Sequence, residues 1–142
     1  FGNSTGNPKD IQWDKIKNQC KNILDEYEEL LDALAKKDST ETRDALCDII
    51  VFTLGAYHLM GYDANADMAA VYSSNMSKFS STPEELEQTV QYYNKNGIKV
   101  HIGGTFPYAW VKSSCAQTGK DGRMFQKDKF LKNINWKEPK FE

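Results

Sequence analysis

Apolar side chains recur at helical spacing near the start of the chain, and no other feature restricts the fold as strongly. Between residues 16 and 34 they lie three, four or seven positions apart, as Ile16, Cys20, Ile23, Leu24, Tyr27, Leu30, Leu31 and Leu34. This spacing predicts an amphipathic helix over about residues 11–37. After the short segment KKDST, a second apolar helix is expected to begin with Asp38, or one of the two residues after it, as its cap and to end at about Met60, before Gly61. So short a connection predicts an antiparallel helical hairpin.

Two further helices follow from capping residues. Asp63 or Asn65 can cap a helix that ends near residue 80, and Thr82, followed by a proline at the first helical position, can cap another. Glu85 stands where a capping box places its acid, and Gly97 is a suitable stop.

After residue 97 the apolar residues alternate instead, around a Gly-Gly pair, which predicts a β-hairpin from residues 98–102 and 108–111. The expected fold class is therefore mainly α: an antiparallel bundle of about four helices with a C-terminal β-hairpin insertion. We expect one domain over residues 11–142. The polar start FGNSTGNPKD, residues 1–10, is expected to be disordered or derived from expression, and it carries no targeting signal.

Composition excludes several classes of protein. No apolar run approaches the ~20 residues that a membrane span needs, and three cysteines without CxxC spacing fit a reducing cytoplasm. Residues 1–119 hold 11 basic and 16 acidic side chains, whereas residues 120–142 hold 7 and 4. An acidic body with a basic tail suits a site that holds cations in one place and phosphate in another. Because no basic stripe interleaved with aromatic residues occurs, we expect neither nucleic acid nor membrane as a partner.

Four carboxylates are the candidate metal ligands. Glu26 and Glu29 lie three positions apart on the first helix, and Asp44 and Asp48 lie four apart on the second, so that each pair shares a side of its helix. The second helix is almost entirely apolar from Ala45 to Met60, and we expect it to be buried around most of its circumference. A carboxylate there is costly unless it is paired or bound to metal. Oxygen ligands in this number favour Mg²⁺ or Mn²⁺ over zinc. The alternative is that both glutamates belong to a solvated face.

An amide and an ammonium group stand close together on the third helix. Asn75 falls on its apolar stripe, where a hydrophobic residue is usual, and Lys78 follows three positions later. Next to a bound metal, such a pair can hold a phosphate chain. The alternative is a helix-terminal Asn beside a Lys that extends into solvent.

Three segments in order resemble the motifs of the MazG-like nucleoside triphosphate pyrophosphohydrolases, in their phage and bacterial branch. They are DEYEEL at 25–30, DALCDIIVF at 44–52 and SNMSKF at 74–79. The resemblance continues through ELEQTVQYYNKNGIKV to GRMFQKDKFLKNINWKEP. It departs from the family's pattern at Ala45, where many members have Glu, and Asp44 stands one position earlier instead.

The resemblance implies roles for individual residues. Glu26, Glu29 and Asp48, with Asp44 as a fourth candidate, would bind Mg²⁺, for which Mn²⁺ could substitute. Asn75 and Lys78 would engage the metal-bound triphosphate, and in KDKFLK both Lys129 and Lys132 become candidates for substrate contacts. Glu26 or Glu29 would accept a proton from water. The implied reaction is hydrolysis of a (deoxy)nucleoside triphosphate to its monophosphate and pyrophosphate, which controls the nucleotide pool.

Two other functions stay open. The first is phosphoribosyl-ATP pyrophosphohydrolase, a related enzyme class that shares the helical core. The second is a non-catalytic helical module that binds metal or protein, against which Asp48, Asn75 and Lys78 argue. Because a small helical core needs additional cover, we expect a homo-oligomer, either dimer or tetramer, in the cytoplasm, or in the host cytoplasm for a phage protein. The base, the sugar and the number of metal ions are left open by the sequence.

Overall fold

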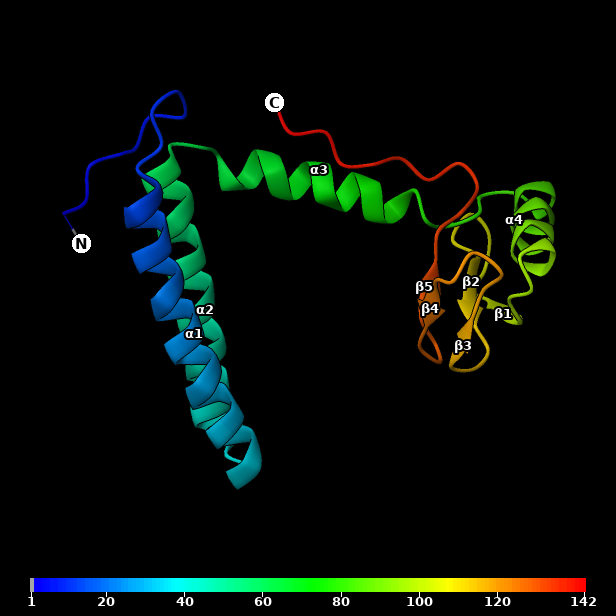
Figure 1. Ribbon diagram of the computed structural model, residues 1–142, viewed down its shortest axis with the longest axis horizontal. Coiled ribbons are helices and arrows are strands. Elements are labelled where there is room, and N and C mark those ends of the chain that lie inside the picture. Colours follow the sequence, from blue (N-terminus) through cyan, green and yellow to red (C-terminus); the bar gives the residue numbers. More distant parts are fainter. Residues whose placement is uncertain (1) are drawn as a thin grey trace. The chain divides into compact units, whose positions relative to one another are not determined.

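The computed structural model describes residues 2–142. The chain divides into two compact units, of which the first ends at Asn65 and the second spans Ala66–Glu142. Figure 1 shows that the first unit is a helical hairpin and that the second holds all the strands. Two compact units do not by themselves make two domains, so one functional domain over residues 11–142 stays a prediction.

The hairpin consists of α1 (Trp13–Lys36) and α2 (Ser39–Met60), which run antiparallel side by side (Figure 1). Asp38 is the N-cap of α2, and its carboxylate accepts hydrogen bonds from the backbone N–H groups of Thr40 and Glu41 at 2.9 and 3.0 Å. Gly61 ends α2 with φ 80°, a left-handed conformation that a glycine adopts without strain. The predicted hairpin, its cap and its stop are confirmed.

The seam between the two helices is narrow and built around small residues. Leu30, Ala33 and Ala45 are its buried members. At the other end of the hairpin, the Gln19 amide donates to the Phe52 carbonyl at 3.0 Å. A Cβ on Gly55 would lie 2.4 Å from the Gln19 side-chain nitrogen, so a larger residue there would displace the Gln19 amide from this hydrogen bond. These contacts fix the register of α1 against α2.

The prediction that α2 is buried around most of its circumference is wrong for this chain by itself. Ala45 is the buried residue of α2, whereas Ile50 and Leu54 are 58% and 51% exposed. On α1, Leu24 and Leu34 are 56% and 53% exposed. The physical reason is that two helices can cover only one stripe of each other. A continuous set of apolar side chains therefore remains uncovered.

The start of the chain contacts the end of α2. The backbone N–H of Gly6 donates to the His58 carbonyl at 2.9 Å, and the His58 ring lies 2.9 Å from the Asn3 carbonyl. A Cβ on Gly6 would lie 1.7 Å from the Leu59 carbonyl oxygen, so this position requires glycine. Within the predicted disordered start, residues 3 and 6 thus have defined contacts.

The second unit contains most of α3 (Ala64–Met76), together with α4 (Pro83–Lys95) and five short strands. Asp63 accepts from the backbone N–H of Asn65 at the start of α3, and Thr82 caps α4 by accepting from Glu85. The strands are β1 (Val100–Gly103), β2 (Trp110–Ser113), β3 (Gln117–Thr118), β4 (Met124–Phe125) and β5 (Phe130–Leu131). They form an antiparallel sheet in the order β1-β2-β5 and a separate β3-β4 pair.

Helix α4 packs on β1 and β2. The core between them consists of Tyr93, Ile98, Val111 and Leu131, each no more than 6% exposed. The predicted class, mainly helical with a C-terminal β-hairpin, is confirmed. The strands β3, β4 and β5 were not predicted, because strands of two residues carry no periodicity.

Among the described residues, none of the helices is by itself both long and apolar enough to cross a membrane. Only α2 and α3 taken together meet that test of length and composition, and the break between them bends by 112°.

Candidate active site

Glu26 lies in the seam of the helical hairpin, level with Asp48. Gln19 of α1 contacts the Phe52–Gly55 segment of α2. Because the helices are antiparallel, Glu26, two turns after Gln19, lies opposite Asp48, two turns before Gly55. Both residues are partly buried. Glu29 follows on the same side of α1, and Asp44 precedes on the same side of α2; both are exposed.

The four predicted carboxylates act on one another electrostatically. The pKa of Glu26 is raised, first by burial of its carboxylate and then by the negative charges of Glu29, Asp48, Asp44 and Asp25, in that order. The negative charges of these neighbours favour the protonated form of Glu26. The structure therefore brings the four acids predicted from the sequence to one side of the hairpin, with Glu26 in the middle.

This donor set fits a hard divalent cation in chemistry and charge, because Mg²⁺ is bound by oxygen ligands such as carboxylates. Within residues 2–142, however, no three acidic, His or Cys side chains converge closely enough to hold an ion. The roles of the four acids as metal ligands therefore stay predictions.

Two grooves open beside these acids. One, with a volume of about 600 Å³, is lined by Asp48 together with Gln19, Val51, Phe52 and His58, so that a carboxylate borders largely apolar walls. The other, of about 460 Å³, is lined by Glu29 with further acids and Lys36. The hairpin thus offers space for a small molecule on the side where its acids gather.

In the second unit, Asn75 and Lys78 contact each other directly. The Lys78 ammonium group donates to the Asn75 side-chain oxygen at 2.7 Å. Both lie at the end of α3, and the Asn75 side chain is exposed. The predicted pair is thus formed. Substrate binding by the pair stays a prediction.

The sequence analysis missed the serines of the same motif. The Ser74 hydroxyl is buried and donates to the Lys137 carbonyl at 2.8 Å, while the Lys137 N–H donates to the Ser77 hydroxyl at 3.0 Å. The C-terminal segment is therefore held against the end of α3. A serine at a buried helical position was the available indication, since a buried hydroxyl needs a partner.

Asn133, four residues before Lys137, also holds the C-terminal segment in place. Its side chain is 3% exposed, and its amide nitrogen donates to the Phe79 carbonyl at 2.9 Å and to the Glu85 carboxylate. The Glu85 carboxylate therefore accepts from Asn133. The predicted capping box would instead have used this carboxylate to accept from the backbone N–H at the start of α4. The loop between α3 and α4, which follows Lys78, is tied to the basic tail.

The two predicted lysines of the tail are exposed. Lys132 places its ammonium group 3.4 Å from the centroid of the Trp136 ring, a close cation–π contact. Lys129 directly precedes β5, and its carbonyl accepts from the Ser113 N–H. Asn75, Lys78, Lys129 and Lys132 therefore belong to one unit, and the carboxylates belong to the other.

The phosphoribosyl-ATP pyrophosphohydrolase family matches residues 5–75, which is half of the chain. The chain therefore belongs to this family, a helical pyrophosphohydrolase type related to the MazG-like enzymes. The matched segment contains all four carboxylates and ends at Asn75, whereas Lys78 and the tail lie beyond it. Comparisons with curated proteins and with solved structures give no match.

The first prediction concerns the pKa of Glu26. Replacing a neighbouring carboxylate by its amide removes a like charge, so Glu29→Gln should lower the pKa of Glu26 more than Asp48→Asn does. A ¹³C NMR titration of the glutamate side chains without metal measures this directly. Asp14→Asn, at the far end of α1, is the matched control and should leave the pKa where it was. Equal values in all four proteins would show that the acids do not share one field.

Proposed function

We propose that this chain is a Mg²⁺-dependent nucleotide pyrophosphohydrolase that cuts between the α- and β-phosphates of a nucleoside triphosphate, with Mn²⁺ as a possible substitute ion. The observation that carries the proposal is the family match, which covers the hairpin completely from α1 to α2 and includes all four candidate carboxylates. Within this hairpin the pKa of Glu26 is raised by burial and by the negative charges of four other acids, which supports binding of a cation beside it.

When bound, the ion would lower the pKa of a water molecule and offset charge on the departing pyrophosphate. The residues of the chain supply the rest. Glu26, Glu29 and Asp48, with Asp44 as a fourth candidate, would hold the ion against the hairpin. Whichever of Glu26 and Glu29 is less engaged with the ion would take the proton of the attacking water. Asn75 and Lys78, already paired at 2.7 Å, would bind phosphate oxygens, with Lys78 as a point charge.

A second substrate is favoured by a specific observation. The family that matches is that of phosphoribosyl-ATP pyrophosphohydrolases, so phosphoribosyl-ATP is the alternative to a free (deoxy)nucleoside triphosphate. Both molecules carry the same triphosphate, and the same bond would break. Most of the second unit lies beyond the matched segment. This difference supports a free (deoxy)nucleoside triphosphate as the substrate rather than phosphoribosyl-ATP. A non-catalytic module is disfavoured by the intact acids and by the formed Asn75–Lys78 pair.

The proposal extends to assembly. The apolar side chains of α1 and α2 that stay uncovered, among them Leu24, Leu34, Ile50 and Leu54, support a homo-oligomer, a dimer or tetramer, in which a second copy covers them. A reducing cytoplasm is supported by three cysteines that are all unpaired.

The products of hydrolysis test the reaction. Incubation with each nucleoside triphosphate, each deoxynucleoside triphosphate and phosphoribosyl-ATP, in Mg²⁺, should yield a monophosphate and pyrophosphate, which anion-exchange chromatography separates. Release of orthophosphate and a diphosphate would contradict the proposed bond. Intact substrates in both Mg²⁺ and Mn²⁺ would favour the non-catalytic module.

Isosteric changes test the carboxylates. Glu29→Gln and Asp48→Asn should each reduce kcat/KM by at least about 100-fold, because each removes a charge that would hold the ion. Thermal unfolding in EDTA should show that both variants are at least as stable as the parent, since a like charge has been removed. Asp14→Asn, in the first turn of α1, is the matched control. Normal turnover by either variant at saturating Mg²⁺ would remove that residue from the site.

The basic tail gives a separate prediction. If Lys132 contributes uniform binding of the triphosphate, Lys132→Ala should raise KM by about tenfold and change kcat less, as loss of one charged hydrogen bond would. Lys129→Ala tests the other candidate, and Lys95→Ala is the control. Light scattering of the parent at assay concentration should give an oligomer. A fully active monomer, or an unchanged KM in both tail variants, would contradict this part of the proposal and leave the carboxylates untouched.

A further inference from the structure

Side chains in and next to α3 and α4 hold the backbone of residues 132–137, which we call the tail segment. On α4, the Tyr93 hydroxyl donates to the Lys132 carbonyl at 2.7 Å, and the Thr89 hydroxyl accepts from the Ile134 N–H at 3.4 Å. The segment then passes to the end of α3 (Figure 1), where two serines bond its backbone. Its path within the second unit is therefore fixed at several points.

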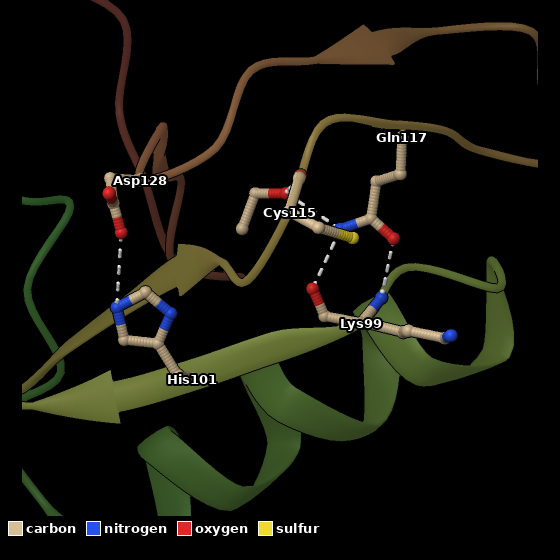
Figure 2. Close-up of polar contacts among 6 residues, drawn as sticks. Lys99, His101, Cys115, Gln117 and Asp128 are labelled. Atoms are coloured by element: carbon tan, nitrogen blue, oxygen red, sulfur yellow. Dashed lines mark hydrogen bonds and ion pairs between the residues drawn. The ribbon is translucent and has the colours of Figure 1, made fainter.

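The chain just before the tail segment is fixed to the sheet. Strand β5 pairs with β2. In the turn that precedes β5, the Asp128 N–H donates to the Ser113 carbonyl, and the Ser113 N–H donates to the Lys129 carbonyl, both at 2.9 Å. The Asp128 carboxylate also lies 3.6 Å from the His101 ring of β1, as Figure 2 shows. A segment that starts from a fixed strand can restrict the motion of the helix end to which it is bonded.

The end of α3 has two adjoining sides with different partners. Ser74 and Ser77 face the tail segment: the Ser74 hydroxyl donates to the Lys137 carbonyl at 2.8 Å, and the Lys137 N–H donates to the Ser77 hydroxyl at 3.0 Å. Asn75 and Lys78 each follow by one position and bond each other at 2.7 Å. Residues three positions apart share a side of a helix. The tail segment therefore bonds the side next to the pair and leaves the Asn75 side chain exposed.

Lys78 lies in a turn beyond the last residue of α3. The N–H groups of Lys78 and Phe79 donate to the carbonyls three positions earlier, of Asn75 and Met76, both at 3.2 Å. Such a turn is of the 3₁₀ type, and helix ends of this kind fray. The Asn133 amide donates to the Phe79 carbonyl at 2.9 Å, immediately after Lys78. The tail segment thus holds the chain on both sides of Lys78.

We infer that the tail segment positions the Asn75–Lys78 pair for phosphate binding, with Ser77 and Asn133 as positioning residues that do not touch the substrate. The inference rests on the phosphate-binding role proposed above for the pair. A lysine on a fraying turn loses more conformational freedom on binding than one whose turn is already ordered, so ordering the turn in advance increases affinity. The tail segment acts here through its backbone, which distinguishes this role from a direct contact between its lysines and the substrate.

Isothermal titration of the full chain with inorganic tripolyphosphate in Mg²⁺ tests the inference without hydrolysis of a nucleotide. Lys78→Gln should weaken the Kd by about tenfold, as expected for loss of one charged hydrogen bond. Asn133→Ala and Ser77→Ala should each weaken it by at least about threefold, since coupled residues interact by this much or more. Neither change should weaken binding further in a chain that already carries Lys78→Gln. Ser77→Thr, which keeps the hydroxyl, should bind like the parent.

Changes at Lys137 separate its backbone from its charge. Lys137→Ala keeps both backbone groups and should bind like the parent, whereas Lys137→Pro lacks the N–H that bonds Ser77 and should match Ser77→Ala. Matched controls are Ser73→Ala on α3 and Asn94→Ala on α4, both exposed, and neither should change the Kd. Circular dichroism shows whether each variant folds. Ser77→Ala and Lys137→Pro keep the test valid if Asn133→Ala does not fold.

The possible failures are distinguishable. If Asn133→Ala and Ser77→Ala weaken binding equally with and without Lys78→Gln, or leave the parent's affinity unchanged, the inference is overturned and the pair remains a phosphate site. Equal weakening by Lys137→Ala and Lys137→Pro would overturn it in favour of a direct effect of the tail's charge. If Lys78→Gln itself leaves the affinity unchanged, or the parent does not bind, the proposed role of the pair fails and the inference fails with it.

Discussion

Packing of α1 against α2 along one narrow seam is the constraint on which the rest of the first unit depends. The apolar contribution of this seam is small, because Leu30, Ala33 and Ala45 are the buried residues of the hairpin. Since the pKa of Glu26 is raised in the folded chain, the folded state binds a proton more tightly than the unfolded state does. Without metal, its stability therefore falls as the pH rises through the interval between the two pKa values. A divalent cation would take the place of that proton.

In the second unit, hydrogen bonds between side chains and backbone hold the polar C-terminal tail in place. Ser74 and Ser77 hold the backbone of Lys137, and Asn133 holds the loop that follows α3. The tail is thereby attached to the helix end that carries Asn75 and Lys78. The backbone of the basic tail is thus fixed within this unit at residues 133 and 137.

Local interactions explain which features could be predicted from the sequence. Residues close in sequence determine the caps at Asp38 and Thr82 and the apolar period of α1. The same holds for the acid pairs on α1 and α2. The remaining features depend on partners distant in sequence. A strand as short as β5 has no period to read, and the hydrogen bond from Asn133 to Phe79 joins residues far apart. The burial of α2 was overestimated because composition does not say which apolar side chains the same chain covers.

The division between the units also bears on the choice of substrate. The family match ends at Asn75, so the acids of the proposed chemistry lie inside it, while Lys78 and the tail lysines lie outside. A metal-assisted cut depends only on the triphosphate, which phosphoribosyl-ATP and a free nucleoside triphosphate share. Preference between them must come from groups that contact the remainder of the molecule. The contact of Lys132 with Trp136 and most of the second unit lie outside the matched segment. We therefore expect the hairpin to determine which phosphoanhydride bond breaks. We expect the residues outside the matched segment to determine whether phosphoribosyl-ATP or a free nucleoside triphosphate is the preferred substrate.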